Sequence, residues 1–230
     1  MEFFYPIVNF FKAGGAFMFP ILLVGAVALA ITVERYVTLA KMGARNRRTW
    51  GQVESVLTSG DFDKARELLS KDESGLSRLL SMGLALQGAV RRRDDVEKAM
   101  QEGMMEIVPQ LEKRTHYLAT AANVATLLGL LGTVSGLIHA FSAVATVNPA
   151  EKANLLAASI SEAMNCTAFG LVTAVPILIV HAFLQSKTTG LSDGLETAAI
   201  RFLNALAARQ AARAQSRLEL VQPAQKAASA

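Results

Sequence analysis

The sequence has few of the residues from which covalent crosslinks and metal sites are built. Its 230 residues include one cysteine, Cys166, and three histidines. A single cysteine cannot form a disulfide within the chain, and it excludes a metal site built from several thiolates. A Gly-rich phosphate-binding loop and a nucleophile paired with a base are also missing. We therefore expect a protein that is not an enzyme and that uses no metal and no cofactor.

Basic motifs with interleaved aromatic residues, which are typical of nucleic-acid-binding proteins, do not occur in the chain. The formal net charge is +4 and the isoelectric point is about 9.4. The lysines and arginines responsible lie outside the apolar stretches, where they serve to orient membrane spans. We therefore expect no nucleic-acid partner.

Charged residues are nearly absent from three long stretches of the chain. The longest, residues 118–147, contains none in thirty residues. At about 1.5 Å per residue, a helix of that length exceeds the ~30 Å hydrocarbon core of a bilayer. Residues 13–34 and 155–184 are similarly apolar, and 52% of the whole chain is hydrophobic. The pattern predicts three membrane-spanning helices in contact with lipid.

The stretches between and beyond these spans are polar and show the apolar spacing of helices. A capping signal occurs at Ser59–Asp61, and Pro109 predicts a kink or joint in the helix leading into the second span. The predicted order is an interfacial N-terminal segment (1–12), a first span (13–34), a cytoplasmic helical domain (35–117), a second span (118–147), a periplasmic loop (148–154), a third span (155–184), a cytoplasmic C-terminal helix (185–221) and a disordered tail (222–230). The predicted fold class is an all-α membrane protein with three transmembrane helices and long cytoplasmic helical extensions.

Basic residues cluster after the first and third spans. The positive-inside rule places both clusters in the cytoplasm, so the amino terminus lies in the periplasm and the carboxyl terminus in the cytoplasm. A secretory signal cleaved after Ala28–Ala30 is an alternative, but the first residues are not basic and the apolar run continues to Val33. The clusters are Arg35, Lys41, Arg45, Arg47 and Arg48, and Lys187, Arg201, Arg209, Arg213 and Arg217.

Hydroxyl and amide side chains form a polar stripe on the second span. Thr126 and Thr133 lie seven residues apart and nearly eclipse on a helical wheel, with Asn123 on the adjacent flank. These hydroxyls either bond to carbonyls of their own helix or line a polar path between helices. The other flank is built from small residues that allow close helix packing, namely Gly129, Gly132 and Gly136.

The third span carries a polar face as well. Thr167 shares one side of the helix with Gly170, and Glu162, Cys166 and Thr173 belong to a neighbouring arc. An intramembrane carboxylate is costly and often functional, but Glu162 is near the end of the span and could instead reach the interface. A proton path needs a titratable group in the membrane, so either Glu162 or a second subunit must supply it.

Three segments together resemble the TolQ/ExbB/MotA proton-channel family. Leu111–Phe141 runs into an "LLGLLGTVxGLI" element, and Ile160–Ile179 is similar to the family pattern "I-x-E-A-L-x-x-T-A-x-G-L-x-x-A-I-P". Gly60–Leu69 looks like a cytoplasmic helix of the same family. Thr126 stands where the family often has proline, and Ala182 where it often has asparagine, which leaves the subfamily open.

The resemblance implies a homo-oligomer, a pentamer, around two copies of a single-span ExbD- or TolR-like partner whose transmembrane Asp carries the proton. The family's two pathway threonines then fall on Thr133 and Thr167, and its third-helix glutamate on Glu162. Thr126, Asn123 and Thr173 would extend the path by hydrogen bonding.

The function implied is that of a stator in the bacterial inner membrane, driven by the proton-motive force. The process that it would energise is outer-membrane transport, envelope integrity or gliding motility. Two alternatives remain, since hydroxyls also ligate Na⁺ and since a helix assembly can hold a partner without conducting. These are a sodium-driven stator and a non-conducting membrane scaffold.

Overall fold

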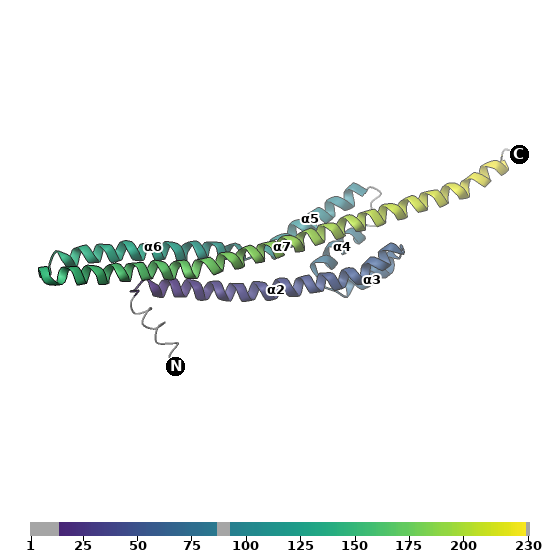
Figure 1. The fold of residues 1–230 in the computed structure, drawn as a ribbon. Helices are drawn as coiled ribbons and strands as arrows, with labels where there is room; N and C mark the ends of the chain where they lie inside the picture. Colours follow the sequence, from purple (N-terminus) through teal and green to yellow (C-terminus); the bar gives the residue numbers. More distant parts are fainter. Residues whose placement is uncertain (1–13, 87–92, 229–230) are drawn as a thin grey trace. The chain divides into compact units, whose positions relative to one another are not determined.

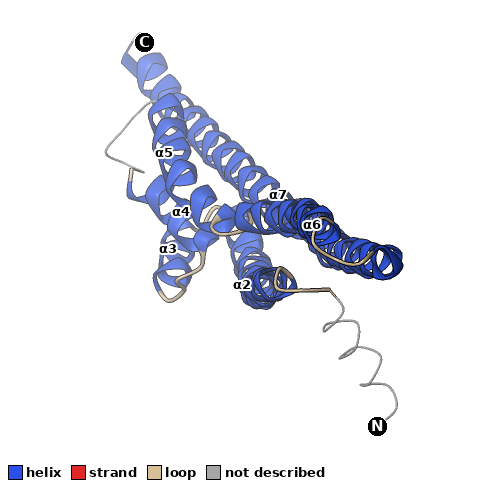
Figure 2. Ribbon diagram, turned by 90° about the vertical axis from the view of Figure 1, so that its left-hand side faces the viewer, coloured by secondary structure: helices blue, strands red, loops and turns tan. Residues whose placement is uncertain are grey.

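The computed structural model describes residues 14–86 and 93–228, and its regular elements are helices throughout this part of the chain (Figure 1). Figure 2 shows the same helices along a second direction, with short loops between them. They are α2 (Met18–Thr58), α3 (Phe62–Ser70), α4 (Gly75–Ala85), α5 (Arg93–Glu112), α6 (His116–Val144) and α7 (Pro149–Ala228). The expected all-α fold is confirmed.

Three helical stretches are long and apolar enough to cross a membrane, and they are Met18–Thr58, Arg93–Val144 and Pro149–Ala212. Only 22%, 22% and 17% of the residues in their most apolar windows are buried inside the chain. A helix that is hydrophobic all round must be covered on every side by apolar material. Lipid or other chains therefore cover most of the surface of these spans.

The chain divides into two units, and each is described here by itself. The first, called the membrane unit, contains the chain up to Val37 together with Lys113–Ser186. The second, called the polar unit, contains Thr38–Glu112 and the chain from Lys187 onward. The long helices α2 and α7 contribute residues to both units.

The core of the membrane unit lies where α2, α6 and α7 meet, and most of its side chains are small. Small side chains allow helix backbones to approach closely, so packing in this unit is set by helix shape and not by large anchors. The buried residues are Ile21, Ala122, Ala125, Cys166 and Ala174, with Phe17, Val24, Leu128, Phe169 and Ile177 packed against them.

The core of the polar unit is built from larger side chains of α3, α4, α5 and the adjoining parts of α2 and α7. Helix α3 begins as its sequence indicates, because the Asp61 carboxylate accepts a hydrogen bond of 3.1 Å from the Lys64 amide. The rings of Phe62 and Phe202 meet edge to face at 6.3 Å between centroids. This contact holds α7 against α3.

A polar cluster joins α2 to the turn between α3 and α4. The Thr49 hydroxyl donates to the Asp72 carboxylate, and the Ser74 amide donates to the same group at 3.3 Å. Burial raises the pKa of the Asp72 carboxyl, but these hydrogen bonds and the Arg45 charge outweigh burial and lower it overall. The carboxylate therefore stays ionised and keeps its bonds at neutral pH.

Several element boundaries differ from the sequence-based expectation. Helix α2 continues without a break from the first span to Thr58, and α7 continues to Ala228 through the tail expected to be disordered. The loop after the second span is short, because α6 ends at Val144 and α7 begins at Pro149. The expected interfacial segment 1–12 lies outside the described residues.

The joint between α5 and α6 occurs at Arg114 and not at Pro109. Helix α5 runs through Pro109 to Glu112, whereas Arg114 adopts φ of +66° in the turn before α6. That left-handed conformation is unfavourable for a residue with a Cβ. Its guanidinium also bridges Glu34 of α2 at 2.8 Å, on the surface of the membrane unit.

We expect Arg114→Gly to be more stable than Arg114→Ala by about 1 kcal/mol, because glycine adopts the left-handed conformation without strain. Both variants lose the same exposed ion pair, which is worth less than about 1 kcal/mol. The free energies of unfolding in detergent micelles test the difference. Equal stability of the two variants would show that the turn stores no strain at Arg114.

Candidate functional site

Glycines set how closely α6 and α7 pack in the membrane unit. A Cβ added to Gly170 would lie 2.8 Å from the Ala125 carbonyl oxygen and 3.1 Å from the Gly129 Cα. A Cβ added to Gly136 would lie 2.8 Å from that of Ala163. The atoms nearest to Gly170 belong to the backbone of α6, so α6 and α7 contact each other through their main chains along this seam. Backbone atoms cannot move aside as side chains can.

Two threonine hydroxyls, one of them at this seam, bind consecutive carbonyls of α6. Thr167 of α7 donates to the Gly129 carbonyl at 2.8 Å, which crosses from one helix to the other. Thr133 donates to the Leu130 carbonyl of its own helix at 2.6 Å. Both threonines are half-buried. The two residues that the family resemblance singles out therefore bind neighbouring carbonyls of the same helix.

The polar stripe continues along α6 away from this pair. Thr126 is half-buried and donates to the Ala122 carbonyl at 3.1 Å, while Asn123 is exposed in the single chain. A hydroxyl that donates its proton to a carbonyl keeps lone pairs that accept from water or from an acid, or that ligate a cation. Bonding within the helix and lining a polar path are therefore compatible roles for these threonines.

Glu162 lies in a separate cavity of about 180 Å³ in the membrane unit. Ser135, His139 and Ser159 also line this cavity, together with the backbone at Gly15. A Cβ on Gly15, whose φ is +74°, would come within 2.1 Å of a Glu162 carboxylate oxygen. The carboxylate thus lies against Gly15, although Glu162 is exposed in the single chain.

Sequence reasoning missed the place of Ser135 and His139 beside this carboxylate. They belong to a face of α6 with the spacing of residues 132, 135, 136 and 139, which is the helical repeat and could have been recognised. The helical wheel of the second span emphasises the threonine stripe of α6 instead. Thr133 and Thr167 do not line the cavity that contains Glu162.

Thr173 faces α2 and not the threonine pair. A Cβ added to Gly25 of α2 would lie 3.0 Å from the Thr173 methyl carbon. Its arc partner Cys166 is buried against Gly132 of α6, whose added Cβ would lie 2.2 Å from the sulfur. The polar arc inferred for the third span therefore meets three different neighbours.

The described residues contain no group of three or more His, Cys, Asp or Glu side chains that could hold a metal ion. The chemistry that the membrane unit supports is that of threonine hydroxyls bound to carbonyls and, in a separate cavity, of one carboxylate. Such groups relay protons through water or bind a partly dehydrated cation, but the threonines cannot themselves carry a charge.

Comparison with known proteins identifies the family of this chain. Residues 71–197 match the MotA/TolQ/ExbB proton channel family, and the match covers the threonine pair, Glu162 and all of α6. This chain belongs to that family. It is a multi-pass inner-membrane protein of the family, with three helices able to span the bilayer.

Relatives in this family cover the chain to different extents. It is 28% identical to the ExbB-like protein 3 of Synechocystis sp. over 76% of this chain and 82% of that protein. It is 35% identical to the Tol-Pal system protein TolQ of Haemophilus influenzae over 42% of each chain. It is also 25% identical to the biopolymer transport protein ExbB of Pseudomonas putida, over 76% of this chain and 56% of that protein.

Proposed function

We propose that this chain is the ring-forming stator subunit of an inner-membrane motor driven by the proton-motive force. The observation that carries the proposal is the pair of half-buried hydroxyls, Thr133 and Thr167, bound to consecutive carbonyls of one helix turn. They place hydroxyl lone pairs within a largely apolar span. Such a site fits an ion in transit better than it fits a lipid-facing surface.

The small share of each span that is buried within the chain supports a ring. The exposed faces of α6 and α7 need cover, and part of that cover comes from neighbouring copies and a central partner. We propose five copies around two copies of a single-span ExbD- or TolR-like subunit, whose transmembrane Asp supplies the missing acid. Bound by the hydroxyls of Thr133 and Thr167, that carboxyl would take up and release the proton.

The hydroxyl stripe marks the line along which the proton would cross the bilayer. Thr126 and Asn123 continue the stripe along α6 toward His116, where the helix begins. The basic residues after the first and third spans favour the cytoplasm for that side. Protons would therefore enter from the periplasmic side near Val144 and leave toward the start of α6.

The process that the motor energises is one of those named for its relatives or proposed for the family. Relatives are named for biopolymer transport and for the Tol-Pal system. We propose that this protein energises an envelope process of that kind, namely outer-membrane transport, envelope integrity or gliding motility.

We expect Thr133→Ala and Thr167→Ala each to lower proton uptake at least tenfold in vesicles that contain this protein and its single-span partner. Thr133→Ser and Thr167→Ser keep the hydroxyl and are the matched controls, which should retain most of the flux. Thermal stability of each variant separates a lost path from a loosened helix seam. Unchanged flux in both alanine variants would refute the path.

Intact cells that contain the complex distinguish the ion and the mode of action. Replacing sodium at a constant pH gradient should leave the driven process unchanged, whereas loss of activity would favour a sodium-driven stator. Collapsing the membrane potential and pH gradient should stop the process. If it continues, the chain acts as a non-conducting scaffold.

A further inference from the structure

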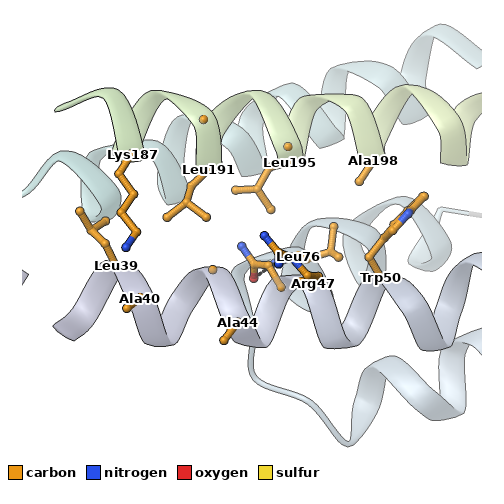
Figure 3. Close-up of a pocket in the computed structure, with 14 residues that line it drawn as sticks. Leu39, Ala40, Ala44, Arg47, Trp50, Leu76, Lys187, Leu191, Leu195 and Ala198 are labelled. Carbon is orange, nitrogen blue, oxygen red and sulfur yellow. Dashed lines mark hydrogen bonds between the residues drawn. The ribbon is translucent and has the colours of Figure 1, made fainter. Parts of the chain in front are cut away.

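A groove with apolar walls lies within the polar unit, between α2 and α7 (Figure 3). Its volume is about 610 Å³. Figure 3 shows Leu191 and Leu195 pointing from α7 toward α2, and Trp50 pointing from α2 toward α7. Leu76 of α4 also lines the groove. It is wide at Gly194, where an added Cβ would meet no atom within 4 Å.

The groove has a defined end and a positive rim. At the end near Trp50, Arg201 lies 5.8 Å from the ring centroid and bridges Glu54 of α2 at 2.7 Å. The charged residues that line the groove are Arg47 and Lys187, and no acidic residue lines it. Residues 38–50 of α2 carry four basic residues and no acidic one. An acidic occupant with an apolar side chain would therefore match it.

The polar unit itself presents such a surface on α5. Met105 is 76% exposed, the highest value among the large apolar side chains that the structure describes as exposed. Exposed carboxylates accompany it at Glu102, Glu106 and Glu112. The helix as a whole carries six acidic and two basic residues. We call Glu102, Met105, Glu106 and Glu112 the acidic face, and the groove the basic groove.

The two surfaces have similar lengths along their own helices. At about 1.5 Å per residue, the basic groove covers ~18 Å of α2 and of α7, and the acidic face covers ~15 Å of α5.

We propose that the acidic face of one copy docks in the basic groove of the next copy, with Met105 placed near Trp50, Leu191 and Leu195. Methionine sulfur packs favourably against an aromatic ring, and the carboxylates would face Arg47 and Lys187. The contact joins two different surfaces, so it repeats head to tail around a closed ring. This inference rests on the ring of the proposed function and adds the surfaces that hold adjacent copies together.

Cysteine crosslinking in membranes tests the contact directly. In a Cys166→Ala background that removes the single native thiol, Met105→Cys and Gly194→Cys are combined in the full chain, made with its single-span partner. Oxidation should give a ladder of covalent oligomers. Asp193→Cys replaces Gly194→Cys in the matched control, since it is adjacent and exposed but does not line the groove. We expect at least tenfold less crosslinking there.

Two variants with different tags confirm that the contact is between copies. Met105→Cys in one chain and Gly194→Cys in the other should crosslink when coexpressed, whereas Met105→Cys alone should not. Arg47→Glu should weaken the crosslink, and adding Glu102→Arg should restore it. A crosslink yield from Met105→Cys with Gly194→Cys that is no higher than the yield from Met105→Cys with Asp193→Cys would overturn the proposal.

The mass of the detergent-solubilised complex distinguishes failure of the docking contact from failure of the proposed function. An intact ring without the Met105–Gly194 crosslink would overturn the docking contact alone. A monomer would overturn the ring of the proposed function as well. A crosslinked ladder in an intact ring is the result that supports both.

Discussion

Replacing Gly170 with leucine is expected to lower proton flux more than tenfold and to destabilise the membrane unit by about 1–3 kcal/mol. The side chain would be directed at backbone atoms of α6, where an added Cβ already lies 2.8 Å from the Ala125 carbonyl oxygen. The two helices must then separate. That separation breaks the 2.8 Å hydrogen bond from Thr167 to the Gly129 carbonyl, which fixes one hydroxyl of the path.

Val172→Phe on the same helix is the matched control, because Val172 is 69% exposed and the added atoms meet no helix of the same chain at close range. Proton uptake in vesicles and the thermal midpoint in detergent are measured for both variants. We expect Val172→Phe to retain flux and stability. Normal flux in a stable Gly170→Leu variant would show that close packing of α6 on α7 is not needed for conduction.

The fold class could be predicted from the sequence because it depends on the pattern of apolar residues over long stretches. Hydropathy reports where a helix leaves the bilayer, however, and not where the helix ends. The continuous α2 illustrates this, since nothing between Glu34 and Thr58 stops a helix more strongly than Gly43 or Gly51. The polar helices of the second unit were recognised by their apolar spacing, and α3 also by the capping signal at its start.

The joint before the second span shows a different limit. Proline inside a helix removes one hydrogen bond, and Pro109 is accommodated within α5. The break occurs at Arg114 because that residue adopts a left-handed conformation, to which arginine has no intrinsic preference. No local sequence signal therefore identified it.

The candidate site was predictable as a set of faces but not as a set of contacts. A helical wheel places Glu162, Cys166 and Thr173 on one arc, because it uses only the angles of the residues about the axis of one helix. In the structure Cys166 packs on Gly132 of α6, Thr173 on Gly25 of α2, and Glu162 lines a cavity with His139. Which helix covers each face depends on how the three helices pack together. The sequence of one helix does not contain that information.

Replacing Phe202 with alanine is expected to lower the free energy of unfolding by about 3–5 kcal/mol, as usual for a large aromatic side chain removed from a core. Phe202 is fully buried, and its ring meets Phe62 of α3 edge to face at 71°. The ring also fills the space over Gly83 of α4, whose added Cβ would lie 2.6 Å from it. One side chain thus holds α7 to both α3 and α4.

The matched control for that variant is Ile200→Ala, two residues earlier on the same helix and 50% exposed. It removes apolar atoms without opening a cavity, so we expect a loss below about 1 kcal/mol. Chemical denaturation in detergent, followed by tryptophan fluorescence at Trp50, measures both variants within the polar unit. Equal losses would mean that α7 is not anchored at Phe202. A loss confined to Phe202→Ala would mean that the groove between α2 and α7 depends on this anchor, because the segment of α7 that lines it leads directly to Phe202.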